Sequence, residues 1–288
     1  VMRLEGHQAN EYNLKDVLAM AYAPNGETLA SAGKDGRVRV WNLDAGQEVM
    51  LLQVPQENGV PFTLCADSLA YSPDGLALAF NGQECALEIL DVASGRQIAY
   101  FEKMGGGVVF TPDGNRIASA VDHLKIWDIG TGETINPPET LDRFRVSSVS
   151  FSTDGGYMAV GYHDGRVRLF WLDCSRYEEA HNFVAHNGPV TCMAFSQSGT
   201  MLATGGADCL VKIWHAKSAK QMKCFIGHSD AVRQVAFVPC ESALVTVSPD
   251  HTARLWSLVQ GQEVAGHYEG GRRCGFAPHL GYLVVSLA

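Results

Sequence analysis

The strongest constraint on the fold is an internal repeat. Three stretches of the sequence align without gaps over their whole length: 17–42, 190–215 and 232–257. Each stretch contains a tryptophan close to its end, and a Gly-His or Ala-His pair precedes it. A repeat with a period of about 40 residues is typical of solenoids, propellers and other arrays. The chain is therefore expected to use one structural unit several times.

Three further copies are weaker but stay in phase with the first three: 68–92, 106–129 and 146–171. The first of them has Leu90 where the tryptophan is expected. The second keeps Trp127 but is one residue short before it, and the third has Phe170 at the tryptophan position with Trp171 one place later. No linker, low-complexity tract or charge run marks a second domain, so a single domain is expected.

Each copy consists of short runs in which apolar and polar residues alternate, as in 190–196, 201–206 and 211–214. Such runs, rich in Val, Ile, Thr and aromatic residues, are typical of β-strands. Asp-Gly and Asn-Gly pairs between the runs supply the positive φ angles of tight hairpins. One four-stranded sheet cannot bury both of its faces, so we expect an all-β fold whose copies stack radially around a channel.

On these six copies the sequence resembles the WD-repeat β-propeller family. The resemblance covers essentially the whole chain and implies a single domain, 1–288, that is a seven-bladed propeller of four-stranded antiparallel blades. The expected blades are, in order, about 6–51, 52–102, 103–140, 141–184, 185–226, 227–265, and 266–288 together with 1–5.

The last blade is expected to combine both ends of the sequence. Residues 1–5 precede Gly6 and His7 with a sequence similar to the one that precedes Gly266 and His267, so they should form the outer strand of blade seven. Residues 272–276 and 282–286 should form its two inner strands. No third strand with its own tryptophan follows them, so blade seven is expected to be incomplete.

In the resembled family a Trp, an Asp, a Ser or Thr, and a His form a hydrogen-bonded set inside a blade. Carried over by position, three such sets are complete here: His7, Ser31, Asp35 and Trp41; His186, Thr204, Asp208 and Trp214; and His228, Thr246, Asp250 and Trp256. Because the indole N–H only donates, a hydroxyl that accepts from it is committed to structure. The resemblance therefore implies that these are structural sets, whose buried polar groups satisfy one another.

Two chemical interpretations compete with the structural one. A Ser, a His and an Asp are also the parts of a hydrolase triad, but an active site has no reason to occur three times. His181, His186, Cys192 and Cys209 follow no recognised zinc spacing, and no phosphate-binding loop is found. We expect no catalytic residue, no metal and no cofactor, with a propeller enzyme or metal-binding propeller as the less favoured alternative.

The family commonly binds partner proteins on the face that carries the His loops and the hairpins between the second and third strands. Carried over by position, the expected partner-binding residues are Asp16, Lys34, Asp67, Met104, Arg145, His163, Arg233 and Arg272. The arginines stand out because the chain has 22 Lys and Arg against 31 Asp and Glu. A guanidinium can bind a carboxylate or phosphate through two hydrogen bonds. An acidic or phosphorylated protein segment is therefore a candidate partner, and arginines that only solvate the surface are the alternative.

Charge and composition exclude further classes of partner and indicate a compartment. A net charge of −9 argues against a nucleic-acid partner, and no run approaches the roughly 18 apolar residues of a membrane helix. Eight cysteines without a C-x-x-C pair favour a reducing compartment, the cytoplasm or nucleus. We expect a non-catalytic scaffold or adaptor for protein–protein interaction. A ligand-sensing or autoinhibitory domain of a larger multidomain signalling protein, with other domains of that parent chain as partners, is the alternative.

Overall fold

The computed structural model describes most of the 288 residues. The described residues are 4, 6–7, 17–33, 35, 37–53, 68–81, 86–101, 107–120, 123–135, 145–173, 176–238, 240–269, 271–277 and 282–287. No element among them is a helix long and apolar enough to cross a membrane.

The described elements are all β-strands, and the first half of the chain forms three antiparallel sheets of four strands. Blade one contains β1 (Val17–Tyr22), β2 (Thr28–Gly33), β3 (Arg37–Asn42) and β4 (Gln47–Gln53). Blade two contains β5 (Leu69–Tyr71), β6 (Ala77–Asn81), β7 (Leu87–Asp91) and β8 (Gln97–Phe101). Blade three contains β9 (Gly107–Phe110), β10 (Arg116–Ala120), β11 (Leu124–Asp128) and β12 (Thr134–Ile135).

The second half adds three more such sheets and a pair of strands. Blade four contains β13 (Val146–Phe151), β14 (Tyr157–Tyr162), β15 (Arg166–Asp173) and β16 (Arg176–Val184). Blade five contains β17 (Val190–Phe195), β18 (Met201–Gly206), β19 (Leu210–His215) and β20 (Lys220–Ile226). Blade six contains β21 (Gln234–Phe237), β22 (Ala243–Val247), β23 (Thr252–Ser257) and β24 (Glu263–Glu269). The remaining pair is β25 (Gly271–Ala277) with β26 (Tyr282–Leu287).

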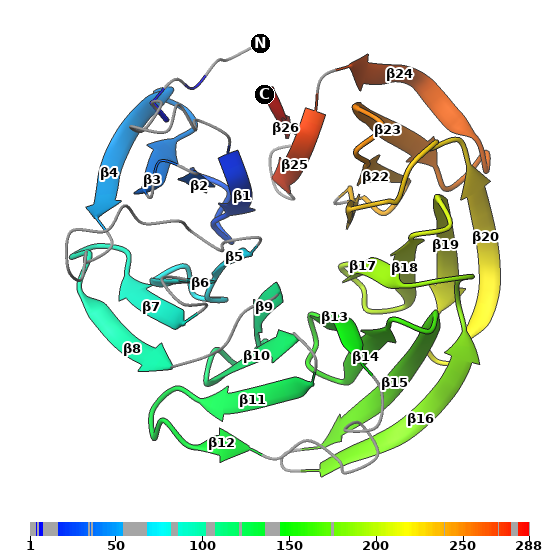
Figure 1. The fold of residues 1–288 in the computed structure, drawn as a ribbon, viewed down its shortest axis with the longest axis horizontal. Coiled ribbons are helices and arrows are strands. Elements are labelled where there is room, and N and C mark those ends of the chain that lie inside the picture. The colour runs from blue at the N-terminus through cyan, green and yellow to red at the C-terminus, as the bar shows by residue number, and fades with distance from the viewer. Residues whose placement is uncertain are drawn as a thin grey trace.

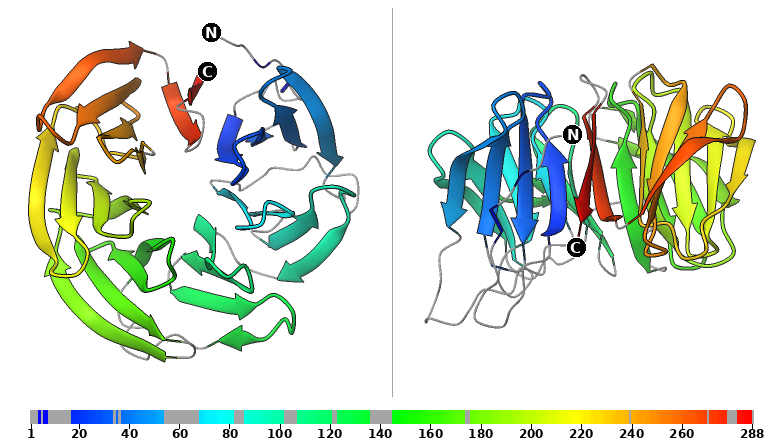
Figure 2. Two further views of the ribbon diagram at one scale, coloured as in Figure 1. Left: turned by 180° about the vertical axis from the view of Figure 1, so that it is seen from behind. Right: turned by 90° about the horizontal axis from the view of Figure 1, so that it is seen from above.

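The sheets stand side by side in a ring, which Figure 1 shows along its axis and Figure 2 from behind and from the edge. The first strand of each sheet is innermost, and each of these strands contacts the first strand of the next sheet. The pair β25–β26 lies between blades six and one, because β25 contacts both β21 and β1. The fold is therefore a β-propeller of four-stranded antiparallel blades, as the sequence predicts.

The expected count of seven four-stranded blades is not confirmed. Six sheets have four strands, and the seventh place in the ring holds the two described strands β25 and β26. These two strands fall where 272–276 and 282–286 were expected. The outer strand assigned to residues 1–5 lies outside the described residues apart from Leu4, which is in no strand.

Tight turns between the first and second strands make each blade possible. Glycines with positive φ stand there in five blades: Gly26, Gly75, Gly114, Gly155 and Gly199. Only glycine adopts this backbone conformation without strain, which explains the Asn-Gly and Asp-Gly pairs of the sequence. In blade six Glu241 takes the same place with φ 52°.

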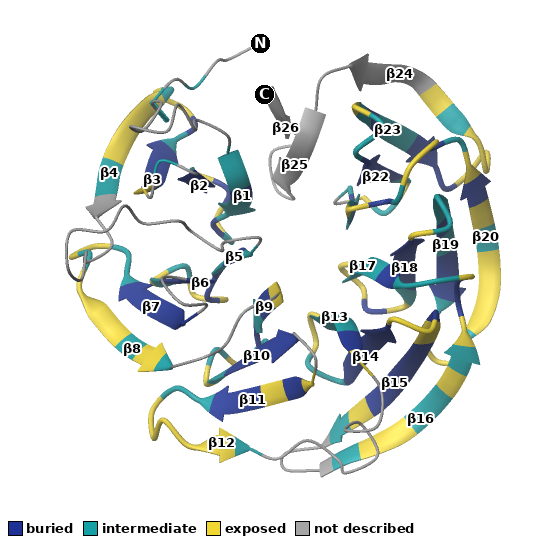
Figure 3. Ribbon diagram, in the orientation of Figure 1, coloured by how far each residue is buried: buried dark blue, intermediate teal, exposed yellow. Residues whose placement is uncertain are grey.

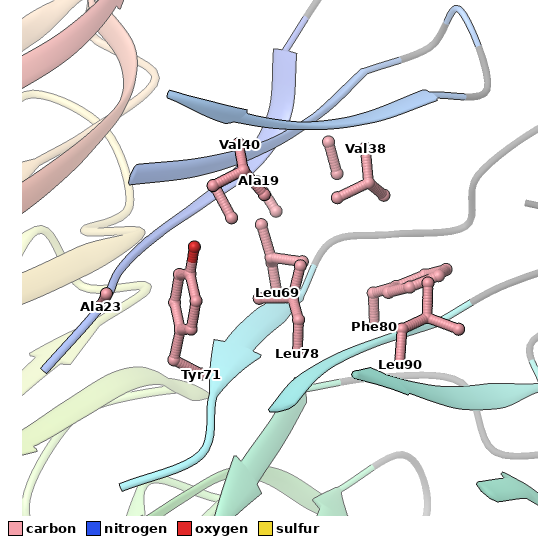
Figure 4. Packing of buried hydrophobic residues seen from close by; sticks show 11 residues of the cluster. Ala19, Ala23, Val38, Val40, Leu69, Tyr71, Leu78, Phe80 and Leu90 are labelled. Atoms are coloured by element: carbon pink, nitrogen blue, oxygen red, sulfur yellow. The ribbon is translucent and has the colours of Figure 1, made fainter. Parts of the chain in front are cut away.

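The core lies between neighbouring blades. In Figure 4, Val38 and Val40 of blade one face Leu78, Phe80 and Leu90 of blade two, and these residues form one buried cluster. Figure 3 shows that burial falls toward the outer strands, which carry most of the exposed residues. Each blade therefore buries both faces only because another blade stands on each side of it.

Candidate functional site

The ring has one face on which two kinds of connection meet. Because successive strands run in opposite directions, the hairpins between second and third strands lie on the same face as the loops that enter the first strands. We call this the top face. The histidines of the expected sets come from the entering loops, and their aspartates come from the hairpins.

The structure brings the twelve residues of the expected sets together in blades one, five and six. The indole Nε1 donates to the hydroxyl at 2.8 Å for Trp41 and Ser31, at 3.0 Å for Trp214 and Thr204, and at 2.7 Å for Trp256 and Thr246. The Nε2 atoms of His7, His186 and His228 lie 2.7 Å, 2.8 Å and 2.8 Å from the same hydroxyls. The three sets thus share one geometry.

The proton positions follow from this geometry. In blade five the Thr204 hydroxyl accepts from Trp214, so its own proton is free to be donated to Nε2 of His186. The proton of the neutral imidazole then sits on Nδ1 and is donated to Asp208 at 2.8 Å. Burial lowers the pKa of His186, which keeps the ring neutral. Every donor in the chain Trp–Thr–His–Asp therefore has a defined acceptor.

The aspartates extend the sets to the backbone of the top face. Asp208 accepts hydrogen bonds from the backbone N–H of Asn187 at 3.0 Å and of Leu210 at 3.2 Å. Asp250 does the same for Ser229 and Thr252. Burial raises the pKa of Asp250, but hydrogen bonds from Thr252, His228 and the backbone outweigh it and lower the pKa to about 2. Each ionised aspartate ties an entering loop to a hairpin.

These sets are poorly suited to nucleophilic catalysis. Thr204 and Thr246 are 0% exposed, and both hydroxyls already accept from an indole. A nucleophile must reach a substrate, and its proton must be free to move to a base. The same arrangement also occurs three times, so nothing singles out one set as an active site.

Two blades replace the hydrogen-bonded pair with an apolar pair. Where the other sets have a hydroxyl and a tryptophan ten residues apart, blade two has Phe80 and Leu90, and blade four has Val160 and Phe170. All four side chains are at most 4% exposed and lie in buried clusters. These blades are packed at the positions where the sets are missing. Blade three keeps Ser119 and Trp127, both buried.

The expected partner-binding residues are placed as follows. Arg145, His163 and Arg233 are exposed on the top face of blades four and six, and the His163 N–H donates to the Arg145 carbonyl at 3.0 Å. Arg272 lies in β25, but its side chain is not described. The other four lie outside the described residues: Asp16, Lys34, Asp67 and Met104.

The residues considered as metal ligands are not brought together. The Nε2 of His181 donates to the Lys217 carbonyl at 2.9 Å, whereas His186 belongs to the set of blade five. Burial raises the pKa of Cys192 to about 12, so its thiol stays protonated. Within the described part of the chain there is no group of three His, Cys, Asp or Glu residues that could hold a metal ion.

Behind the sets lies a second layer of contacts that was not predicted from the sequence. A basic residue two places before the tryptophan position pairs with a glutamate of the outer strand: Arg39 with Glu48, Arg168 with Glu179 and Arg254 with Glu263. The sequence pattern that could have predicted this layer is a Lys or Arg two residues before the tryptophan position, which occurs in five of the six copies. Blade two departs from it with Glu88, which is 5% exposed and has a buried Oε2 without a hydrogen-bond partner.

Comparison with known proteins agrees with this geometry. The family model for the "WD domain, G-beta repeat" (WD40) matches four regions: 1–42, 138–170, 177–215 and 219–257. The chain is 36% identical over 88 residues to Protein tipD of Dictyostelium discoideum, covering 30% of this chain and 14% of that protein. It is 23% identical over 296 residues to Nuclear distribution protein nudF of Aspergillus niger, covering 91% of this chain and 65% of that protein. It is 21% identical over 246 residues to SIR4-interacting protein SIF2 of Saccharomyces cerevisiae, covering 85% of this chain and 39% of that protein. The chain thus spans less than two thirds of the length of each of these relatives.

Proposed function

This chain belongs to the WD40 repeat family, and from that premise we propose that it is a non-catalytic scaffold that binds a partner protein or peptide on its top face. The name of one relative, SIR4-interacting protein SIF2, states that it interacts with another protein. A rigid ring of packed blades provides a fixed platform for such contacts. The hydrogen-bonded sets support the platform, since they anchor the loops and hairpins from which the top face is built.

The observation that carries the proposal is the pair of exposed arginines on this face. Arg145 and Arg233 stand on blades four and six of an acidic protein, with exposed Ala207 of blade five between them along the ring. A guanidinium recognises a carboxylate or phosphate through two parallel hydrogen bonds. The proposed partner segment is therefore acidic or phosphorylated. Arg272 of β25 is proposed as a third contact.

We further propose that residues 1–5 form the outer strand of the blade whose inner strands are β25 and β26, which makes the propeller seven-bladed. In blades four and five an outer-strand phenylalanine three residues before the histidine, Phe183 or Phe225, packs on the tryptophan of the next blade. Leu4 stands three residues before His7 and packs against the buried cluster of blade one that contains Trp41. This equivalent contact supports the assignment.

The proposed location is the cytoplasm or nucleus. The described cysteines whose side chains are placed are free thiols: Cys192, Cys209, Cys224 and Cys240. Free thiols are typical of proteins in a reducing compartment.

The test is affinity capture from a lysate of the source cells. The wild type should retain a partner that the Arg145→Ala/Arg233→Ala/Arg272→Ala variant loses, and the retention should weaken as salt is raised, because exposed charges are screened. The matched control is Arg96→Ala/Lys217→Ala/Lys220→Ala, which removes three exposed cations at turns of the opposite face. Equal capture by the two triple variants would reject the top face as the binding surface.

A further inference from the structure

The hairpin formed by β15 and β16 differs from its five counterparts. In the other blades the third strand ends at a polar residue just after the tryptophan position, and its side chain bonds the turn that follows. Asn42 accepts from the Ala45 N–H at 2.7 Å, and Asp91 accepts from the Ser94 N–H at 2.7 Å. In blade four this position is Trp171, which cannot cap a turn, and the strands continue until Asp173 pairs with Arg176.

One side of this longer hairpin is anchored in the protein. Leu172 and Tyr177 pack against the buried cluster that contains Phe170. Tyr177 also hydrogen-bonds Arg116 of blade three, and its pKa is raised, chiefly by burial. The hairpin therefore has a fixed position relative to the ring.

The opposite side carries an exposed tryptophan on a prearranged base. Side chains alternate along a strand, so Trp171 lies on the same side as Leu169, which faces blade five. The Trp171 ring packs on the ring of Tyr157, tilted by 34° and with 4.5 Å between the centroids, and the Tyr157 centroid in turn lies 6.4 Å from that of Phe195. Even so, Trp171 is 41% exposed. A rigid, half-open indole of this kind loses little entropy on binding and is the side chain most enriched in binding hot spots.

The charge around this indole is negative. Glu178 is exposed and stands directly opposite Trp171 in the strand register, so its carboxylate shares the same side of the hairpin. Asp154 lies close enough to Tyr157 to raise the pKa of its phenol, after the larger effect of burial. Hydrogen bonds from Ser152 and Gly156 lower the pKa of Asp154, which keeps it ionised. Within the described residues neither carboxylate forms an ion pair. Lys217 is the basic residue of the turn between β19 and β20 in the neighbouring blade five.

We propose that Trp171, Tyr157, Glu178 and Asp154 form a docking site for an arginine side chain of a basic partner segment, on the side of blade four and away from the top face. A planar guanidinium can stack on an indole while it donates hydrogen bonds to an adjacent carboxylate. The net charge of −9 favours a basic partner over an acidic one here. The site is independent of the arginines of the top face.

The test is the binding of a fluorescein-labelled hexa-arginine peptide, measured by anisotropy at physiological salt. Trp171→Leu leaves the net charge unchanged and should weaken binding about fivefold or more, as expected for loss of a cation–π contact. Glu178→Gln should weaken it as well, whereas Glu133→Gln, at an exposed glutamate of blade three, should not. A hexa-lysine peptide should bind less tightly and depend less on Trp171.

Two results would overturn the proposal. Unchanged affinity of Trp171→Leu excludes the indole, and equal losses for Glu178→Gln and Glu133→Gln show that only the overall charge attracts the peptide. The triple arginine variant of the top face should bind the peptide at least as well as the wild type, which separates this site from the proposed function. Circular dichroism of each variant checks that it is folded.

Discussion

Arg39 of blade one and Glu88 of blade two occupy the same position, two residues before Trp41 and Leu90 respectively, and carry opposite charges. Arg39 is paired with Glu48. Glu88 is 5% exposed, faces Phe80 across the strands, and has a buried oxygen without a hydrogen-bond partner. A buried carboxyl without a partner is tolerated far better when it is protonated.

This difference predicts a pH dependence of stability. Burial raises the pKa of Glu88 to about 7 from its ordinary 4.5. A pKa that is higher in the folded state contributes stability that is fully present below pH 4.5 and is lost as the pH rises through 7. The stability advantage of Glu88→Gln over the wild type should therefore be small near pH 5 and should grow to about 3 kcal/mol at most near pH 8.

The measurement is the difference in melting temperature between the two proteins from pH 5 to pH 8. Burial lowers the pKa of His186 and His228, which gives their contribution to stability the opposite pH dependence. This contribution is the same in both proteins, so it cancels in the difference. Glu48→Gln, at the partly exposed partner of Arg39, serves as the control. A difference that stays constant with pH would contradict the prediction.

The hydrogen-bonded set of blade five should contribute to stability and to no turnover. Removing His186 takes away one of the two side-chain hydrogen bonds of the Thr204 hydroxyl and the imidazole partner of Asp208. His186→Ala and Asp208→Ala should each cost about 1–3 kcal/mol for every buried group left unsatisfied. Urea denaturation measures the loss, and His163→Ala, at an exposed histidine, should change stability little. Wild-type stability in both variants would refute the structural role.

Replacing the apolar pair of blade four by a hydrogen-bonded pair should be tolerated only when both residues are changed together. Val160→Thr alone places a hydroxyl at a site that is 0% exposed, next to Phe170, which cannot donate to it. The expected loss is about 1–3 kcal/mol. Adding Phe170→Trp supplies an indole donor at the same ten-residue spacing as Trp214 and Thr204, and should recover part of the loss. A double-mutant cycle measures this coupling, and strictly additive losses would speak against it.

The hairpin glycine of blade four should not tolerate a side chain. Gly165 has φ 86°, and a Cβ there would collide with the backbone carbonyl of His186. Gly165→Ala should destabilise the protein by at least about 2 kcal/mol, because the strain and the collision add. Cys209, at the corresponding hairpin of blade five, already has φ 65°, so Cys209→Ala is the matched control and should be nearly neutral. Chemical denaturation compares the two.

Much of the fold was predictable because it depends on local pattern. Alternation of apolar and polar residues sets the strands, and Gly26, Gly75 and Gly114 mark their turns. The strand β17, for example, starts at Val190, the first residue of the repeat copy 190–215. The members of each set were also predictable, since Thr204, Asp208 and Trp214 lie within one hairpin and keep a constant spacing. The number of complete blades was not, because it depends on how distant parts of the chain meet.

What the sequence by itself determined is therefore the repeating unit: its strands, its turns and the polar set that closes a blade. Only the tertiary structure decided which side chains this unit buries and which it exposes. Glu88 is buried on the side of blade two where its neighbour Phe80 packs in a cluster with blade one. Trp171 is exposed because its hairpin extends past the polar turn of the other blades. The physical reason is that burial depends on neighbours in another blade, about 40 residues away in the chain, whereas strand and turn formation depends on residues a few places apart.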